Sequence, residues 1–384
     1  MSNKKKIRLA TVFSGIGAPE QALKKLDVDY DIIFACDNDE IELKESIEEI
    51  KDNYKKSDYK DIKQYVNDLY SNTKKPKYVK QSYFANYDID EDRWYPDIRF
   101  LDGKQYKDKV DLYIGGSPCQ SFSIIGKRGG LEDTRGTLFY EYARLINEMQ
   151  PKAFIYENVP GMLMHDKGNT WKVIKDVFES LGYNVNYKIL NAKDYGIPQD
   201  RRRLFVVGIK DKNVEFNFPE PKELNTTMFD YLEDKVETKH YLGKKGFEFV
   251  TNPKYKNRAR INKDIIQTEK ANQQFNWNGD FVFEDYEKVK DNEEIMNRAY
   301  IGTYEGKKGA IRQLSYRECM RLMGFSDNYK IVVPNVPAYR QAGNSIVVDV
   351  MEEVLKELFK VVKFWWRRLD WQQYFQELVQ LSLR

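Results

Sequence analysis

The chain has 384 residues, of which 41% are hydrophobic and 32% charged, a composition typical of a soluble globular protein. Its formal net charge of +3 is too small to argue by itself for a nucleic-acid partner. No apolar run is long enough to cross a bilayer, and the N-terminal residues lack the apolar centre of a signal peptide, so we expect a cytoplasmic protein without membrane contact. Three widely spaced cysteines predict neither a disulfide framework nor a zinc site, and we expect no bound metal.

The first predicted elements are a strand, a glycine turn and a helix, all within IRLATVFSGIGAPEQALKKL. A second strand, DIIFACDNDE, ends in acidic residues, so the two strands open a βαβ unit whose ligand lies at the carboxyl ends of its strands. Gly15 and Gly17 would let a ligand approach the backbone closely, and Asp37 could bind a ribose hydroxyl. Glu20 stands where the dinucleotide-binding pattern has its last glycine, so the turn alone is about as often structural as ligand-binding.

Strand and helix patterns continue to alternate up to about residue 210. Residues 51–95 are rich in lysine and tyrosine and predict a helical insertion that lies on the surface. Further strands are expected in YPDIRFL, KVDLYIGGSP, KAFIYENVPGM, YNVNYKILNAKDYGIP and RRLFVVGI, with helices in GTLFYEYARLINEM and TWKVIKDVFESLGY. The alternation predicts an α/β fold with a mainly parallel, Rossmann-like sheet that is covered by helices on both faces.

The alternation fails from about residue 216, where the sequence becomes polar and irregular. We therefore predict a catalytic domain over residues 1–215 and a smaller domain over residues 216–309. Helical patterns return in residues 310–360, where Ser315 and Glu318 form a capping box, and this segment is expected to pack back on the first domain. The remaining residues, 361–384, predict an amphipathic tail helix.

The cysteines are not equivalent. Cys36 lies inside a predicted strand and Cys319 on the apolar face of a predicted helix, so both are expected to be buried and structural. Cys119 follows a strand directly, at the edge where an α/β sheet places its active site, and a thiol there could act as a nucleophile. The two histidines, His165 and His240, lie in loops that do not favour a Cys–His dyad.

Polar residues end two further strands. Glu157 and Asn158 end one strand, and Arg201 and Arg203 are two residues apart, a spacing that places them on one face of another. A glutamate near arginines is usually a salt bridge. Together with a thiolate, however, a carboxyl that can share a proton and a bidentate cation would suit attack on an electron-poor ring that carries a carbonyl and an amine.

A set of short motifs occurs in a fixed order along the chain: FSGIGAPEQAL, GGSPCQSFSIIGKRGGLEDTRGTLFYEYARLI, ENVPGM, LNAKDYGIPQDRRRLFVVG, RQLSYRECMRLMGF and YRQAGNSIVV. This series resembles that of the cytosine-5 DNA methyltransferases and covers roughly residues 7–210 and 311–358. The resemblance implies the Rossmann-like fold of S-adenosylmethionine-dependent methyltransferases and methyl transfer to carbon 5 of cytosine in a short duplex DNA site.

The resemblance also implies the catalytic roles. Cys119 matches the nucleophile that adds to carbon 6 of cytosine, and covalent addition makes carbon 5 a better methyl acceptor. Glu157 matches the carboxyl that hydrogen-bonds the ring nitrogen in its protonated form. Arg203 matches the arginine that binds the cytosine carbonyl, with Arg201 as its neighbour, and Asn158 is expected to position the loop.

The implied methyl donor is S-adenosylmethionine, bound at the first glycine turn. The residues that match its site are Phe13, Ser14, Gly15, Ile16 and Gly17 of the turn, Asp37 for the ribose, Asp97 and Ile98 for the adenine, and Pro118, Leu138, Asn344 and Ser345 at the methionine end.

Duplex DNA buries the target carbon in the base stack, and enzymes of this kind flip the base out. The loop from Gln120 to Thr137 is expected to close over the flipped cytosine. Its expected DNA contacts are Gln120, Ser123, Lys127, Arg128 and Arg135. Residues 216–309 would then recognise the target sequence, through basic and aromatic stretches such as KNRAR and QQFNWNGDF.

Two alternatives remain open from the sequence: an RNA cytosine methyltransferase of the same fold, and a DNA-binding relative without catalytic activity. The catalytic set Cys119, Glu157 and Arg203 disfavours the second, since all three residues are present. We expect a monomer that acts on double-stranded DNA as a bacterial or phage modification enzyme, and a matching restriction endonuclease is the expected genetic partner.

Overall fold

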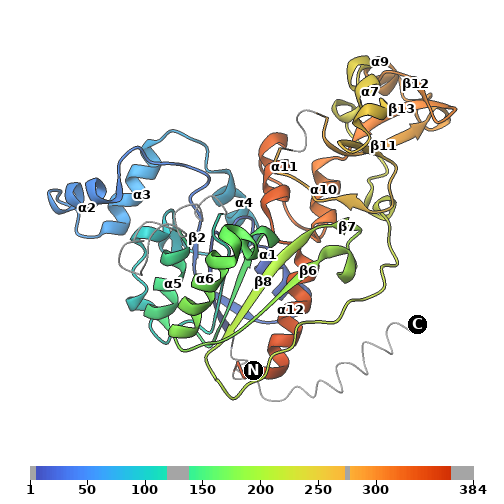
Figure 1. The fold of residues 1–384 in the computed structure, drawn as a ribbon. Coiled ribbons are helices and arrows are strands. Elements are labelled where there is room, and N and C mark those ends of the chain that lie inside the picture. The colour runs from blue at the N-terminus through green and yellow to red at the C-terminus, as the bar shows by residue number, and fades with distance from the viewer. Residues whose placement is uncertain (1–5, 119–137, 273–276, 365–384) are drawn as a thin grey trace, which may run out of the picture.

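The computed structural model describes residues 6–118, 138–272 and 277–364. Its centre is a seven-stranded sheet in the order β3-β2-β1-β4-β5-β8-β6 (Figure 1). The strands are β1 (Ile7–Val12), β2 (Tyr30–Cys36), β3 (Trp94–Tyr95), β4 (Leu112–Gly115), β5 (Ala153–Asn158), β6 (Asn184–Asn191) and β8 (Arg202–Ile209). Strands β3, β2, β1, β4 and β5 run parallel, whereas β8 runs antiparallel to both β5 and β6. The predicted mainly parallel sheet is confirmed.

Helices cover both faces of this sheet. On one face α1 (Ala18–Lys25) and α12 (Val348–Val361) pack on Leu9, Leu112 and Ile155. The other face carries α5 (Leu138–Met149) and α6 (Asn169–Ser180). Because both faces are buried, the central strands β1, β4 and β5 read as nearly continuous apolar runs rather than as an alternating pattern.

The lysine- and tyrosine-rich insertion is helical, as predicted, and consists of α2 (Ile47–Lys55), α3 (Ile62–Asn72) and α4 (Tyr78–Asn86). Helices α2 and α3 project from the body (Figure 1) and share a small core that includes Val66. The prediction of a surface insertion is wrong for α4. Tyr83 of α4 is fully buried, and Tyr87 directly after the helix is buried as well. Both rings belong to the core on the α1 side of the sheet and do not face water.

A smaller sheet, in the order β12-β13-β11-β9, stands apart from the main body at the upper right of Figure 1. Its strands are β9 (Ala259–Ile261), β11 (Gly279–Asp285), β12 (Gly302–Tyr304) and β13 (Lys307–Gln313), accompanied by the helices α7 (Lys244–Val250), α8 (Tyr286–Val289) and α9 (Glu293–Arg298). Strand β13 crosses residue 309, and β10 (Ile266–Gln267) pairs with β7 (Gln199–Asp200) of the first half of the chain. The domain limits drawn from the sequence stay a prediction.

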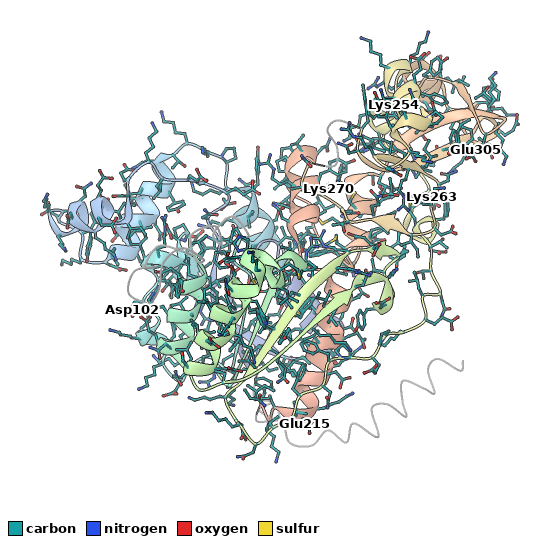
Figure 2. All side chains as sticks on the ribbon, in the orientation of Figure 1. Asp102, Glu215, Lys254, Lys263, Lys270 and Glu305 are labelled. Carbon is teal, nitrogen blue, oxygen red and sulfur yellow. The ribbon has the colours of Figure 1, made fainter. Side chains whose placement is uncertain are left out.

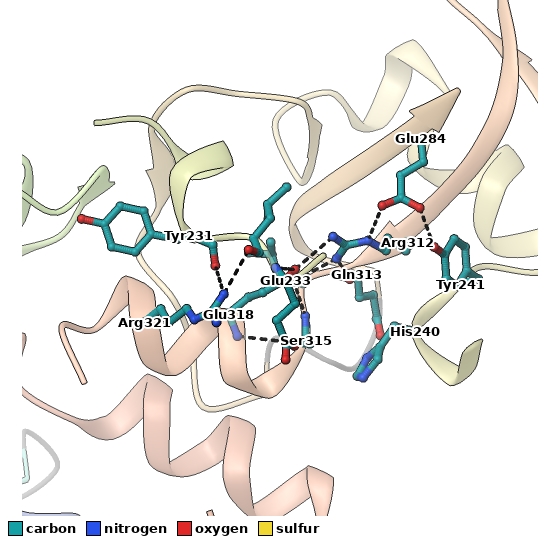
Figure 3. A network of polar contacts seen from close by, with 12 residues as sticks. Tyr231, Glu233, His240, Tyr241, Glu284, Arg312, Gln313, Ser315, Glu318 and Arg321 are labelled. Atoms are coloured by element: carbon teal, nitrogen blue, oxygen red, sulfur yellow. Dashed lines mark hydrogen bonds and ion pairs between the residues drawn. The ribbon is translucent and has the colours of Figure 1, made fainter. Parts of the chain in front are cut away.

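A buried polar network joins the smaller sheet to α10 (Tyr316–Leu322), as Figure 3 shows. Arg312 is fully buried and donates to Glu318 at 2.8 Å and 3.0 Å and to Glu284 at 3.1 Å. Tyr241 also donates to Glu284. Ser315 caps α10 in the predicted capping box with Glu318, which is therefore confirmed.

The chain then continues through α11 (Asn335–Asn344) into α12, on the face of the sheet that carries α1. Helix α12 contacts α1 of the first half of the chain. Most of the predicted tail helix, residues 365–384, lies outside the described residues. Among the helices of the described ranges, none combines the length and the apolar character that crossing a bilayer requires.

Candidate active site

The turn that follows β1 has an unusual backbone. Phe13, Gly15 and Gly17 have φ angles of 51°, 52° and 77°, in the left-handed region that favours glycine and strains other residues. The Gly15 N–H donates to Asp37 Oδ2 at 2.9 Å, so the acid at the end of β2 is fixed against the turn. An alanine Cβ at Gly15 would meet only the Phe13 carbonyl oxygen, at 4.0 Å, so a ligand can approach the backbone on that side.

A cavity lies over this turn, at the carboxyl ends of β1 and β4. Its lining contains half of the predicted cofactor set, namely Phe13, Ser14, Gly15, Ile16, Asn344 and Ser345, together with Thr11 and Gly115. Asn344 comes from the end of α11 and donates to Glu40 at 2.8 Å. The structure thus brings the returning C-terminal segment to the first glycine turn, some 330 residues earlier in the chain.

The other residues predicted for the cofactor are not part of the lining of this cavity. Gly17 begins α1, and Asp37 backs the turn. The Asp97 carboxylate forms a bidentate ion pair with Arg99 and accepts a hydrogen bond from Tyr70 at 3.0 Å. Two further positions are apolar, Ile98 buried in the core and Leu138 partly buried at the start of α5, whereas Pro118 is exposed. Their roles toward a cofactor stay predictions.

Ser117, two residues before Cys119, is held by hydrogen bonds to the end of β5. Asn158 Nδ2 donates to the Ser117 carbonyl oxygen at 2.8 Å, and the hydroxyls of Ser117 and Tyr156 lie 2.6 Å apart. Gly116 lies directly against β5, because a Cβ there would stand 2.3 Å from the Glu157 carbonyl oxygen. Sequence reasoning did not identify Gly116 or Tyr156, although the glycine pair before Ser117 was a signal for close backbone approach.

Glu157 and Arg203 form an ion pair, with 3.2 Å between Oε1 and Nε. Residue Glu157 is opposite Phe205 in the β5–β8 ladder, so its side chain and that of Arg203 are on the same face of the sheet. Burial raises the pKa of Glu157 above its ordinary value, and the positive charges of Arg203 and Arg201 oppose that rise. The carboxyl is therefore placed both to hold a proton and to accept from a cation.

Arg201 has a different position from that of Arg203. It is buried, and its guanidinium donates to the carbonyl oxygens of Glu269, Gly343 and Ser345, at 2.9, 2.9 and 2.7 Å. Burial lowers its pKa to about 9. Arg201 thus joins three distant segments of the chain, and its charge also acts on Glu157.

The remaining site predictions fall on residues 119–137, which lie outside the described ranges. They are the nucleophile Cys119 and the DNA-contacting residues Gln120, Ser123, Lys127, Arg128 and Arg135. Cys36 and Cys319 are buried, as expected of structural cysteines. In the part of the chain that the structure describes, no three His, Cys, Asp or Glu side chains are grouped as a metal site would need.

The basic stretch KNRAR lies in the smaller sheet and its flank (Lys254 and Lys263 mark the neighbourhood in Figure 2). Its two arginines differ. Arg258 is exposed and donates to Asn278 at 3.0 Å, whereas Arg260 forms an ion pair with the buried Asp280 at 3.3 Å. Arg258 therefore faces solvent, whereas Arg260 is directed at a buried carboxylate of the same sheet. Residues 273–276 of the stretch QQFNWNGDF lie outside the described ranges.

Comparison with known proteins gives a consistent result. Residues 63–360 match the family model of the C-5 cytosine-specific DNA methylases. The chain is 37% identical over 300 residues to the type II methyltransferase M.HpaII of Haemophilus parainfluenzae, which covers 73% of this chain and 80% of that protein. It is 34% identical over 296 residues to the type II methyltransferase M.HhaI of Haemophilus parahaemolyticus, covering 75% of this chain and 86% of that one.

Solved structures share the fold. The structure of the S. pombe Dnmt2 methyltransferase aligns with a TM-score of 0.61 at 19% identity, covering 93% of this chain and 99% of that chain. At this level of identity the likeness concerns the fold alone, and it extends over the central sheet and the smaller domain together.

Proposed function

The chain belongs to the C-5 cytosine-specific DNA methylase family, and on that premise we propose that Cys119, Glu157 and Arg203 carry out the methyl transfer to cytosine in DNA. The observation that carries the proposal is the Glu157–Arg203 ion pair at the carboxyl edge of the sheet, with Gly116 held against Glu157. Cys119 follows Gly116 by three residues. The acid and the cation therefore meet where β4, β5 and β8 lie together, and we propose that Cys119 completes the set.

The covalent step belongs to Cys119. Its thiolate forms a bond to carbon 6 of cytosine, which turns carbon 5 into a nucleophile and divides one difficult step into two easier ones. After the methyl group has been added, carbon 5 gives up its proton to solvent, the electrons return to the ring, and the bond between Sγ and carbon 6 breaks. The thiolate is thereby regenerated, and the net change at carbon 5 is one methyl group for one proton.

Glu157 and Arg203 prepare the ring for that attack. A protonated Glu157 donates to the ring nitrogen, so the negative charge that develops during thiolate addition is neutralised. Burial favours this protonated form, because it raises the pKa of Glu157. Arg203 would bind the carbonyl of the base and limit the motion of the Glu157 carboxyl. Asn158 would position the loop, and Arg201 adds a second positive charge that acts on Glu157.

The methyl donor we propose is S-adenosylmethionine, which when bound supplies an electrophilic methyl group. The residues present fit such a ligand, since the cavity over the turn is open on the side of Gly15, whose N–H is bound by the Asp37 carboxylate. Asp37 would bind a ribose hydroxyl, Phe13 would offer its ring face to the sulfonium, and Asn344 and Ser345 would close the methionine end.

We further propose that the substrate is a short site in double-stranded DNA and that the target cytosine is flipped out of the duplex. The predicted domains 1–215, 216–309, 310–360 and 361–384 would act as catalytic domain, target-recognition domain, returning segment and tail. The protein would work as a monomer in the cytoplasm. Methylation would protect the DNA from a matching restriction endonuclease. The names of the relatives, which are type II methyltransferases, support this proposal.

The test is expression of the full chain in a host without cytosine methylation, followed by bisulfite sequencing of its DNA. Protected cytosines in one short motif, absent with Cys119→Ser, are the expected result. If the DNA is fully converted and the purified protein methylates transfer RNA instead, the RNA alternative is correct. Unaltered DNA binding with no methyl transfer to either substrate would support the non-catalytic alternative.

A further inference from the structure

Helix α4 and the residue that follows it contact the turn formed by residues 13–17. Tyr87, at the C-terminal end of α4, donates its hydroxyl to the carbonyl oxygens of Gly17 and Ile16, at 2.6 Å and 3.1 Å, and accepts from Gln21 at 3.1 Å. The ring fills the space beside Gly17, where an added Cβ would lie 2.2 Å from a Tyr87 ring carbon. Tyr87 thus fixes both the carbonyl orientation and the left-handed backbone of the turn.

A second tyrosine of α4 makes a parallel contact. Tyr83 is fully buried and donates to Glu20, whose carboxylate also accepts from Thr11 at 3.2 Å. Thr11 lies 2.8 Å from the Ser14 hydroxyl, and both residues line the cavity. Glu20 is fully buried, and its burial raises its pKa to about 6. The hydrogen bonds from Tyr83 to Glu20 and from Thr11 to Glu20 therefore connect α4 to the cavity lining through buried groups.

The other end of α4 is attached to the segment that follows β2. Asp39 accepts from the backbone N–H groups of Val79 and Lys80, the first turn of α4. The Asp39 N–H in turn donates at 2.9 Å to Asp37, the residue that binds the Gly15 N–H. One helix therefore connects the turn after β1 with the acid after β2.

Such a brace matters because the turn is strained. A left-handed conformation costs roughly 1–2 kcal/mol for a residue with a Cβ, and Phe13 adopts it with φ at 51°. Strained backbone persists only where the surrounding structure determines it. Without the tyrosine hydroxyls, the turn would relax in the absence of ligand, and binding would have to restore its conformation.

We propose that Tyr87, assisted by Tyr83, is a positioning residue for the methyl donor. It preorganises the turn formed by residues 13–17 and acts on donor affinity rather than on the chemical step. This inference rests on the proposed binding of S-adenosylmethionine at that turn. It assigns a role to the insertion that its lysine- and tyrosine-rich composition did not indicate.

The test compares Tyr87→Phe with Tyr183→Phe in the full-length protein. Tyr183 is the matched control, because its buried hydroxyl also donates to a carbonyl oxygen, that of Pro151, at 2.7 Å. Pro151 precedes the amino-terminal end of β5, whereas the turn of residues 13–17 follows the carboxyl end of β1. Calorimetry would measure Kd for S-adenosylmethionine and for S-adenosylhomocysteine, and steady-state assays on duplex DNA would measure KM and kcat. Tyr87→Phe should raise Kd and KM about three- to tenfold, the worth of one hydrogen bond, and leave kcat within about twofold. Tyr183→Phe should change neither.

Equal Kd values for the two variants, or a fall in kcat at unchanged KM, would overturn the inference. If Tyr87→Phe does not fold, Tyr83→Phe carries the same test with the same expected direction. Failure of the proposed function looks different, since wild-type protein would then bind no donor or methylate no DNA. The inference itself fails if the wild-type protein binds the donor and methylates DNA, and the Tyr87 and Tyr83 variants bind the donor as tightly as the wild type.

Discussion

Asn158 Nδ2 lies 2.8 Å from the carbonyl oxygen of Ser117, so the end of β5 holds the backbone two residues before Cys119. Replacement by aspartate, Asn158→Asp, keeps the acceptor for the Val159 N–H and removes the donor. Losing a buried hydrogen bond costs about 1–3 kcal/mol, so we expect kcat to fall about ten- to hundredfold. Donor affinity should remain unchanged. A variant with wild-type kcat would separate Asn158 from the placement of Cys119.

Glu157→Gln should remove the shared proton while it preserves the shape of the side chain. We expect kcat to fall by about 10²- to 10⁴-fold, the usual contribution of an acid or base, with DNA binding retained. Because the protonated carboxyl is the active form and its pKa is raised, wild-type kcat should fall as pH rises through that raised value. The variant should show no such fall. A pH profile shared by both proteins would assign the titration to another group.

Gly116→Ala tests the close approach of β4 and β5. The new Cβ would stand 2.3 Å from the Glu157 carbonyl oxygen, so one strand end must move. Overpacking of this kind costs about 1–3 kcal/mol of stability, and kcat should fall because Glu157 shifts. Gly161→Ala is the control, since its Cβ would meet no atom within 4 Å. Urea unfolding and kcat should be near wild type for the control alone.

Glu269 is a buried carboxyl between Arg201, Cys319 and Asp280, and burial raises its pKa from 4.5 to about 8. Between these values the folded state keeps the proton and the unfolded state does not, so the free energy of unfolding falls as pH rises through this window. Glu269→Gln carries no titrating proton and should reduce that loss. Urea midpoints at pH 5.5 and pH 8.5 would test this, with the exposed Glu305→Gln as control. An identical pH dependence in all three proteins would contradict the assignment.

Arg312→Ala should destabilise the junction of the smaller sheet with α10. It leaves the carboxylates of Glu284 and Glu318 buried without their cation, at a cost of about 3–5 kcal/mol. Lys175→Ala removes an ion pair with Glu179 on the outer side of α6 and should cost about 1 kcal/mol or less. Equilibrium urea unfolding measures both. Similar losses for the two variants would mean that burial of the Arg312 network contributes little.

Local patterns determined much of the fold. Apolar runs that alternate with amphipathic helices predicted the central sheet and its covering helices, because each pattern depends on neighbours in the sequence. Ser315 and its capping box were readable for the same reason, being three residues from Glu318. The pairing of Glu157 with Arg203 was implied by the family motifs and not by strand geometry, because Arg203 lies at the start of β8 and meets the end of β5 only since the two strands run antiparallel.

The tertiary structure alone decided the contacts between distant segments. Composition predicted a surface helix for the segment that became α4, yet its tyrosines are buried against the glycine turn. Tyr329 donates to the Ile16 carbonyl oxygen across 313 residues of sequence, and Arg201 binds carbonyls from two other segments. No local periodicity encodes such pairs, because a buried hydrogen bond depends on where the packed core brings its two partners. The sequence by itself therefore determined the sheet and pointed to the groups that we propose react, and packing determined how the described ones, Glu157 and Arg203, are held in place.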